Sequence, residues 1–465
     1  MKRWIVVGCL LLVGCGVSIS ADRAGSETAG AATEGLPPDL RTRKTGEDWP
    51  AFLGPNHDST SPEKGLQVPW PAGGPRIVWQ KEVGIGYAMP SVSRGRLFLF
   101  DRVRNTARLQ VMKAETAEPL WKFEYATDYR DKYGYNGGPR CCPVVDGDRV
   151  YLFGPEGMLH CLRVRDGKLL WKRDTTAEFG VVQNFFGVGS TPVVEGDLLL
   201  TMVGGSPPGS ETVAFEELKG NGSAIVAFDK FTGKTRYQVG NELASYASPV
   251  VRTLGKRRYG LFFARGGLVG IDPASGKIEF TYPWRANMLE SVNASNPVVV
   301  GSRLLLTECY ELGGAVLDLE EGKLREVWTD RERPSRVKSM RAHWMTPIVV
   351  DGYAYVSSGR HRNEAELRCV EVATGKVVWR EPGLTRSSLL LVDGHFVCLG
   401  EDGYLRLVKV NPRKYEEVSA VLYKDSDGQP LLEEPCWAAP ILSNGLLFLR
   451  SERRLVCVEL IPVKK

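Results

Sequence analysis

Residues 142–153 read CPVVDGDRVYLF, and this stretch decides the fold because the chain repeats it. Each copy opens with a short apolar run, and in most copies a turn such as Asp146-Gly147 follows. The copies begin at Pro90, Pro143, Pro192, Pro249, Pro297, Pro347 and Pro440, and a copy without the proline begins at Leu389. Successive starts are 42 to 57 residues apart. A period of this length indicates a repeat architecture.

Each repeat carries the signals of four strands. Proline suits the first residue of a strand, which can spare its N–H, and the Asp-Gly turn makes a hairpin to a second strand. A third apolar strand follows, and a Gly-Lys turn such as Gly167-Lys168 leads to a fourth. The fourth strand usually ends in an aromatic residue, at Trp121, Trp171, Tyr237, Phe280, Trp328 and Trp379, and we align none in the seventh repeat. Four-stranded antiparallel units at this period are the signature of a β-propeller.

The strand signals predict eight blades and a closed ring. There are eight first strands, but the eighth repeat contains only three strands. A further strand signal at residues 76–83 precedes every first strand. We expect this N-terminal strand to complete the last blade, because it would close the ring and hide the edges of an open stack. The predicted fold is an all-β, eight-bladed propeller of four-stranded antiparallel blades over residues 76–463.

Residues 1–14 predict a secretory signal peptide. Lys2 and Arg3 precede an apolar run of about ten residues, shorter than the ~20 that a membrane-spanning helix needs. Leu12-Val13-Gly14-Cys15 resembles the bacterial lipobox, which implies cleavage before Cys15 and lipidation of its thiol. The alternative is ordinary cleavage and soluble export. Gly16 rather than Asp after the cysteine favours the outer membrane by analogy.

Two segments separate Cys15 from the propeller. Residues 15–46 are rich in Ala, Gly, Ser, Thr and Glu and predict a flexible tether, and residues 47–75 form an N-terminal extension. The formal net charge of +5 is spread along the chain without a basic block, so we expect no nucleic-acid binding. We expect a monomer that contacts the membrane only through the lipid anchor. Export would place the cysteines in a compartment where disulfides form.

Several repeats resemble the pyrroloquinoline-quinone-like (PQQ-like) repeat, which ends in Asp-x-x-Thr/Ser-Gly-Lys-x-x-Trp. The matching segments are 229–234 (DKFTGK), 272–277 (DPASGK) and 373–379 (ATGKVVW). The resemblance covers about residues 76–460, and the lead-in Asp48-Trp49-Pro50 is similar to the N-terminal extension of many bacterial members. It implies the propeller fold but leaves two functions open. Quinoprotein dehydrogenases hold PQQ and Ca²⁺ at the axis and oxidise alcohols or sugars, whereas BamB-like lipoproteins bind other proteins and catalyse no reaction.

The adjacent cysteines Cys141 and Cys142 are the feature that favours the enzyme. In quinoprotein alcohol dehydrogenases, a disulfide between adjacent cysteines lies over the quinone, and Arg140 precedes the pair here in a similar context. Such a bond is strained, since neighbouring Cα atoms are about 3.8 Å apart and disulfides prefer ~4.4–6.8 Å. The alternative is two small residues at a crowded blade entrance, as at Ser190-Thr191 and Ala438-Ala439.

The residues that would bind Ca²⁺ and react with substrate are missing. Ca²⁺ takes about six to eight oxygen ligands, partly from carboxylates. The enzymes supply Glu, Asn and Asp from successive blades, but residues 203–208 contain no Glu, and Arg265 lies in the stretch where the enzymes carry Asn. The five histidines are scattered, without the spacing of a metal site. The sequence therefore predicts no catalytic residues, no metal site and no cofactor.

Long connections on one face of the propeller should carry any binding site, since loops on a rigid scaffold carry function. We expect residues just before each first strand to ring the mouth of the central channel there. They are Tyr87, Arg140, Asn184, Phe185, Tyr246, Asn293, His343, Trp344, Arg386 and Trp437. Such side chains suit a polar ligand or a peptide, although they could equally plug the axis. Arg140 and Arg386 have the stronger functional case, because a buried arginine needs an acceptor.

The sequence predicts an exported, lipid-anchored, eight-bladed PQQ-like propeller that acts as a non-catalytic binding scaffold. Its partner would be a periplasmic or outer-membrane protein, or a small polar ligand at the channel mouth. The alternative is a quinoprotein-like alcohol or sugar dehydrogenase that uses PQQ and Ca²⁺.

Overall fold

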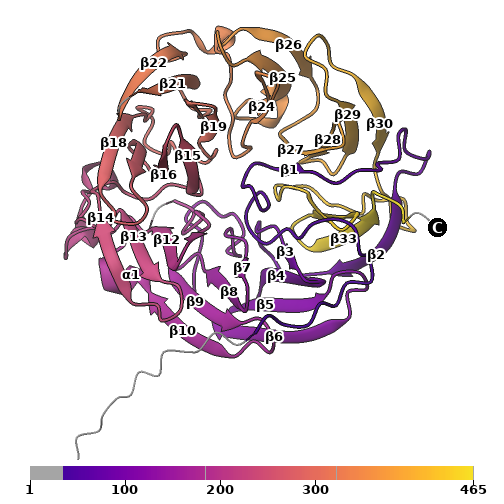
Figure 1. Cartoon of the computed structure of the whole chain (residues 1–465), viewed down its shortest axis with the longest axis horizontal. Coiled ribbons are helices and arrows are strands. Elements are labelled where there is room, and N and C mark those ends of the chain that lie inside the picture. The colour runs from indigo at the N-terminus through magenta and orange to yellow at the C-terminus, as the bar shows by residue number, and fades with distance from the viewer. Residues whose placement is uncertain (1–34, 184, 321, 464–465) are drawn as a thin grey trace, which may run out of the picture.

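The computed structural model describes residues 35–183, 185–320 and 322–463. The strands of these residues form eight sheets that surround a central axis as the blades of a propeller (Figure 1). The predicted fold class is confirmed. The signal peptide, Cys15 and the first part of the predicted tether lie outside the described residues.

The first four blades follow one another along the chain, each with its innermost strand first. Blade 1 contains β3 (Ser91–Ser93), β4 (Arg96–Val103), β5 (Thr106–Lys113) and β6 (Pro119–Ala126); blade 2 contains β7 (Val144–Asp146), β8 (Arg149–Phe153), β9 (Met158–Arg163) and β10 (Leu169–Asp174); blade 3 contains β11 (Val193–Glu195), β12 (Leu198–Met202), β13 (Ile225–Asp229) and β14 (Thr235–Val239); blade 4 contains β15 (Val250–Leu254), β16 (Arg257–Phe263), β17 (Gly267–Ile271) and β18 (Ile278–Pro283).

The remaining blades complete the circle. Blade 5 contains β19 (Val298–Val300), β20 (Arg303–Thr307), β21 (Gly314–Glu320) and β22 (Lys323–Thr329); blade 6 contains β23 (Ile348–Val350), β24 (Tyr353–Ser358), β25 (Glu366–Glu371) and β26 (Val377–Pro382); blade 7 contains β27 (Ser387–Val392), β28 (His395–Gly400), β29 (Leu405–Lys409) and β30 (Glu417–Val421); blade 8 contains β31 (Ile441–Ser443), β32 (Leu446–Arg450), β33 (Arg454–Glu459) and β2 (Arg76–Glu82).

In the described residues, helical segments occur only in the connections between strands. The short helix α1 (Thr175–Phe179) follows β10, and the Asp174 side chain caps it by accepting a hydrogen bond from the Ala177 N–H at 2.9 Å. Four 3₁₀ turns lie at Ser210–Thr212, Phe215–Glu217, Ser335–Val337 and Arg362–Glu364. Among these residues, no helix is both long and apolar enough to cross a bilayer.

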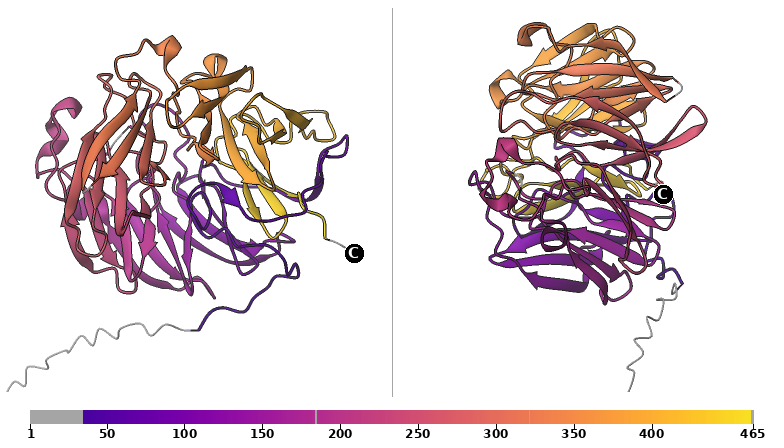
Figure 2. Two further views of the ribbon diagram at one scale, coloured as in Figure 1. Left: turned by 45° about the horizontal axis from the view of Figure 1, so that its top comes forward. Right: turned by 90° about the vertical axis from the view of Figure 1, so that its left-hand side faces the viewer.

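Blade 8 is built from both ends of the chain. β2 pairs antiparallel with β33, in a register that runs from Arg76 opposite Glu459 to Glu82 opposite Arg454. The predicted closure by an N-terminal strand is confirmed, and Figure 2 shows the ring from two further directions.

The residues before β2 run across the face that carries the short turns between first and second strands. We call this the short-turn face and the opposite one the mouth face. Residues assigned to the tether already contact it, since Leu40 N–H donates to Arg94 O at 3.1 Å and Arg43 pairs with Glu459 at 2.9 Å. Further on, β1 (Thr60–Ser61) adds a parallel strand beside β27 in blade 7. The repeat pattern gave no sign of this strand, because it lies outside the repeats.

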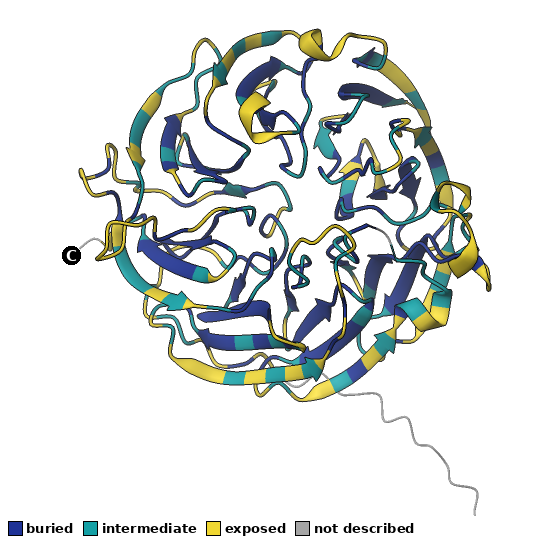
Figure 3. Cartoon of the chain, turned by 180° about the vertical axis from the view of Figure 1, so that it is seen from behind, coloured by how far each residue is buried: buried dark blue, intermediate teal, exposed yellow. Residues whose placement is uncertain are grey.

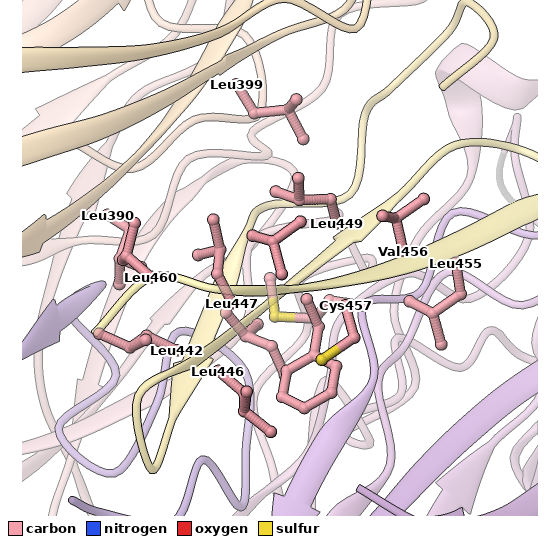
Figure 4. Close-up of a cluster of buried hydrophobic side chains, with 14 of the residues drawn as sticks. Leu390, Leu399, Leu442, Leu446, Leu447, Leu449, Leu455, Val456, Cys457 and Leu460 are labelled. Carbon is pink, nitrogen blue, oxygen red and sulfur yellow. The ribbon is translucent and has the colours of Figure 1, made fainter. Parts of the chain in front are cut away.

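The core lies between neighbouring blades. Inner strands are buried on both faces, whereas the outer fourth strands alternate between exposed and partly buried residues (Figure 3). The cluster in Figure 4 packs the C-terminal strands of blade 8 against blade 7, with Leu390, Leu399, Leu447 and Leu455 all fully buried. Cys161, Cys369 and Cys457 occupy equivalent third-strand positions and are also fully buried.

An aromatic side chain in the fourth strand joins most blades to the next. Trp328 in blade 5 donates its indole N–H to Val372 O of blade 6 at 2.8 Å, and its ring covers Gly375 in the following Gly-Lys turn. The same contact is made by Trp121 on Gly167, Trp171 on Gly233 and Tyr237 on Gly276. Phe280 departs from the pattern by lying over Gly270 of its own blade, and the space above Gly322 is open.

This contrast yields a matched pair of substitutions. Gly375 and Gly322 both have positive φ, at 71° and 79°, but only a Cβ on Gly375 would meet the Trp328 ring, at 2.8 Å. We expect Gly322→Ala to cost about 1–2 kcal/mol for the left-handed backbone, and Gly375→Ala to cost roughly 1–3 kcal/mol more for overpacking. Thermal unfolding of both variants measures the difference. Equal losses would mean that the aromatic ring does not constrain this turn.

Candidate functional site

A chain of hydrogen bonds fixes the inner ends of successive blades. In blades 3 to 6, the side chain of the residue before the first-strand proline accepts a backbone N–H from the equivalent residue one blade earlier. Cys142 N–H donates to Thr191 Oγ1 at 3.2 Å, Thr191 N–H to Ser248 Oγ at 2.9 Å, and Ser248 N–H to Asn296 Oδ1 at 2.8 Å. Asn296 N–H continues to Thr346 Oγ1 at 3.1 Å. Small polar side chains at this position therefore hold the wall of the axis together.

A cavity of about 220 Å³ lies on the axis at the centre of this wall. Its sides come from the residues just before the first strands, on the mouth face. Phe52, Leu53 and Ser59 of the N-terminal extension also line it, and we infer that they form its floor because the extension runs on the short-turn face. The central channel is thus open at one end only.

The floor is a compact group of turns. Leu53 O accepts hydrogen bonds from the N–H groups of Asp58 and Ser59 at 3.1 and 2.9 Å, and Leu53, His57 and Ser59 all have positive φ. Trp49 packs against these turns, with its ring in contact with Gly54. Left-handed backbone in residues other than glycine costs free energy and persists only where surrounding contacts enforce it.

Five aromatic rings at the mouth of the cavity contact one another in a series. Phe186 contacts Tyr246 at 5.4 Å between ring centroids and Tyr135 at 5.6 Å, and Tyr135 contacts Trp437 at 5.6 Å. Trp437 in turn contacts Trp344 at 5.3 Å. Because these five rings come from connections to five different blades, they couple the blades at the mouth as well as lining it.

Arg386 is held between two of these rings and neutralised by a buried carboxylate. Its guanidinium lies 4.8 Å from the Trp344 centroid and 5.4 Å from that of Trp437, and it donates to both carboxylate oxygens of Glu401 at 2.6–3.0 Å. Trp437 Nε1 donates to the same carboxylate at 3.0 Å. Burial alone would raise the pKa of Glu401, but these hydrogen bonds outweigh it and lower the pKa.

Arg140, in the connection to blade 2, is neutralised in the same way. Its Nη2 donates to Asp131 Oδ2 at 2.7 Å, and its guanidinium lies 5.5 Å from the Tyr87 ring. The Asp131 side chain is fully buried and also accepts the Tyr133 N–H at 2.9 Å. Neither arginine is left with an unpaired charge for a ligand.

His343 adds a neutral group to the wall. Its Nε2 lies 3.3 Å from Tyr310 Oη, and burial together with the nearby Arg386 and Arg360 lowers its pKa to about 3. Within the described residues, His343 Nδ1 and Trp344 Nε1 are buried without a hydrogen-bond partner. Unsatisfied polar atoms of this kind are few in folded proteins, although in this chain they also occur away from the cavity, for example at Trp70 Nε1 and Trp284 Nε1.

The structure brings most of the predicted mouth residues together. Tyr87, Arg140, Tyr246, His343, Trp344, Arg386 and Trp437 line the cavity. Phe185 packs behind it against Phe215 and Arg265. Asn293 is buried in the wall, where Nδ2 donates to Ala264 O at 2.8 Å and Trp284 O at 3.0 Å. Asn184 lies outside the described residues.

Cys141 and Cys142 are both free buried thiols. Cys141 packs in the cluster between blades 2 and 3, whereas Cys142 packs in the cluster of blades 7, 8 and 1. The two side chains thus belong to different parts of the core. Burial raises the pKa of the Cys142 thiol to about 12, which keeps it protonated.

Sequence reasoning missed the floor residues and several wall residues. Phe52, Leu53 and Ser59 precede the repeats, so the period of the repeats could not place them. Tyr135 and Phe186 lie within long connections, where only their aromatic character could have drawn attention. The partners lie nearby in the chain, Asp131 nine residues before Arg140 and Glu401 fifteen residues after Arg386, but no sequence signal links them.

The lining does not fit a Ca²⁺–quinone centre. In the part of the chain that the structure describes, the cavity is lined by aromatic, aliphatic and hydroxyl side chains with two arginines and one histidine, and by no Asp or Glu. The nearest carboxylates already pair with Arg140 and Arg386. Over the same residues, no three His, Cys, Asp or Glu side chains form a cluster that could hold a metal ion.

Comparisons with known proteins identify relatives over most of the propeller. A family model described as "Outer membrane protein assembly factor BamB" matches residues 105–381, more than half of the chain. BamB of Burkholderia pseudomallei (strain K96243) is 24% identical over 399 residues, which cover 79% of this chain and 96% of that protein.

Solved structures share the fold at low identity. BamB from Moraxella catarrhalis aligns with a TM-score of 0.54 and 13% identity, covering 84% of this chain and 98% of that one. A quinohemoprotein alcohol dehydrogenase from Comamonas testosteroni aligns with a TM-score of 0.60 and 10% identity, covering 90% and 81%. At these identities, the two likenesses show the fold alone.

The buried His343 should make stability depend on pH. Its folded pKa of about 3 lies below the ordinary value of 6.5, so the unfolded chain binds more protons as pH falls. Between pH 7 and pH 5 this histidine should cost about 2 kcal/mol of stability. We expect His343→Gln to remove that part of the pH dependence in denaturant titrations. His160 is also buried, in blade 2, and its pKa is lowered to about 4. The effect of replacing His160 with Gln is the comparison for His343→Gln. If His343→Gln loses as much stability between pH 7 and pH 5 as the wild type does, the low pKa of His343 is contradicted.

The composition of the lining also predicts how the chain responds to the quinone. We expect no Ca²⁺-dependent binding of pyrroloquinoline quinone, because carboxylate ligands are needed to hold Ca²⁺. Trp344 and Trp437 line the cavity, so a quinone bound there would quench tryptophan fluorescence. Titration of the full chain with and without Ca²⁺ measures this, and saturable, Ca²⁺-dependent quenching at micromolar quinone would overturn the expectation.

Proposed function

Because the chain belongs to the family of outer membrane protein assembly factor BamB, we propose that it is an exported, non-catalytic scaffold for outer-membrane protein assembly. The observation that carries the proposal is the family match over residues 105–381, together with a BamB relative aligned over 96% of its own length. The neutral cavity lining supports a binding role over the quinoprotein alternative.

The mouth face is the surface proposed to meet a protein partner. Exposed apolar side chains stand on its long connections: Tyr133 and Tyr135 before blade 2, Val213 within blade 3, Leu289 before blade 5 and Val337 before blade 6. Interfaces are enriched in aromatic residues relative to the rest of a protein surface. The partner would be a periplasmic or outer-membrane protein.

The attachment of the N-terminal segment supports an orientation at the membrane. We propose export by the signal peptide at residues 1–14 and anchoring to the outer membrane through lipid on Cys15. The segment that leads from this cysteine joins the propeller on the short-turn face, where Arg94 Nε donates to Pro37 O at 2.8 Å. An anchor on that side leaves the mouth face free for a partner in the periplasm.

Site-specific photo-crosslinking tests the proposal in cells that produce the full chain. A photoreactive residue in place of Tyr133, Leu289 or Val337 should give adducts with a protein of the outer-membrane assembly machinery. The matched control replaces Lys256, which is exposed in the β15–β16 turn of the short-turn face. We expect few or no adducts there. Equal crosslinking from both faces, or adducts only from Lys256, would contradict the proposed use of the mouth face.

A further inference from the structure

We propose that the axial cavity receives one uncharged aromatic side chain from the protein partner. The inference rests on the proposed scaffold function and identifies the chemistry by which the mouth face recognises its partner. Three properties of the cavity lead to it: its volume, its charge and the rings of its wall.

The volume suits a single ring. The cavity measures about 220 Å³. Pockets for drug-sized ligands are typically about 300–1,000 Å³, whereas an engineered cavity of about 150 Å³ holds benzene. The floor formed by Phe52, Leu53 and Ser59 closes the far end, so a peptide could not pass along the axis. An occupant must enter from the mouth as the tip of a side chain.

The charge of the wall suits a neutral group. Glu401 neutralises Arg386 and Asp131 neutralises Arg140, with N–O distances of 2.6 and 2.7 Å. His343, whose pKa is lowered to about 3, is uncharged at neutral pH. A carboxylate or ammonium group would lose its hydration on entry without gaining a free opposite charge. Arg140 and Arg386 already lie against the Tyr87, Trp344 and Trp437 rings, so these rings are less able to attract a further cation. We therefore expect no Lys, Arg, Asp or Glu side chain as the occupant.

The rings favour an aromatic occupant over an aliphatic one. Tyr87, Tyr135, Phe186, Trp344 and Trp437 all line the cavity and contact one another. Aromatic pairs gain interaction free energy beyond the area they bury. Buried aromatic anchors in preformed pockets are also the residues that dominate protein interfaces. A Trp, Tyr or Phe side chain on an exposed segment of the partner satisfies all three properties.

Small amides that carry the side chains test the cavity without the partner. We would measure binding of N-acetyl-L-tryptophanamide and N-acetyl-L-leucinamide to the purified full chain by saturation-transfer NMR. We expect the aromatic amide to bind at least tenfold more tightly. Equal binding of the two amides, or no detectable binding of the aromatic one at millimolar concentration, would overturn the inference.

Cavity-filling variants tie binding to this site. Ala439 and Ala294 line the cavity and are partly exposed, so Ala439→Leu and Ala294→Leu fill it without removing a contact. Each should weaken binding of the aromatic amide at least tenfold. Ala177→Leu, on the exposed surface of α1, is the control and should bind as the wild type does. Binding unchanged in both filled variants, with wild-type circular dichroism, would overturn the inference.

The same variants separate this inference from the proposed function. If Ala439→Leu crosslinks to the partner as well as the wild type does, the scaffold function stands and the inserted side chain is refuted. If the mouth face captures no partner although the amide binds, the scaffold proposal fails, and with it the assignment of the occupant to a partner. Loss of both crosslinking and amide binding in Ala439→Leu, but not in Ala177→Leu, is the expected result.

Discussion

The structure depends on one pairing, that of β2 with β33, which joins the two ends of the chain in blade 8. Without β2, blade 8 would contain only three strands, and β33 would present an unpaired edge. Unpaired edges of this kind invite association with other chains. β2 is the outer strand of this blade, and the residues before Arg76 reach it across the short-turn face.

The cavity is a consequence of that approach. The extension crosses the short-turn face, where Glu63 accepts the N–H groups of Asn444 and Gly445 at 2.8 and 2.7 Å and β1 pairs with β27. Between these attachments and the bridge from Trp49 to Val92, residues 50–59 are confined over the axis. The positive φ angles at Leu53, His57 and Ser59 are the local cost of that confinement. The segment that leads into the closing strand β2 thus covers one end of the axial channel and leaves a cavity with one entrance.

The fold was predictable from sequence because its decisive signals recur. The proline before the first strand, the Gly-Lys turn and the fourth-strand aromatic residue play the same structural role in most blades. The seventh blade shows the limit of this reasoning. Its fourth strand, β30 (Glu417–Val421), carries Ser419 opposite Leu407, where other blades carry the aromatic residue, and Val421 covers Gly74 before β2. The repeat pattern also placed Asn293 at the mouth, although its amide satisfies carbonyl groups within the wall.

The chemistry of the site was less accessible from sequence because it depends on pairs that the repeat does not encode. Arg140 and Arg386 could be selected individually from the sequence, because a buried arginine needs an acceptor. Their acceptors, Asp131 and Glu401, sit in connections of variable length, and only the folded chain brings them within hydrogen-bond distance. Once paired, the four groups leave a neutral, ring-lined surface at a position where the same fold could hold a charged centre. Because both carboxylates already pair with arginines, the cavity lining in the described residues offers no free carboxylate to a cation.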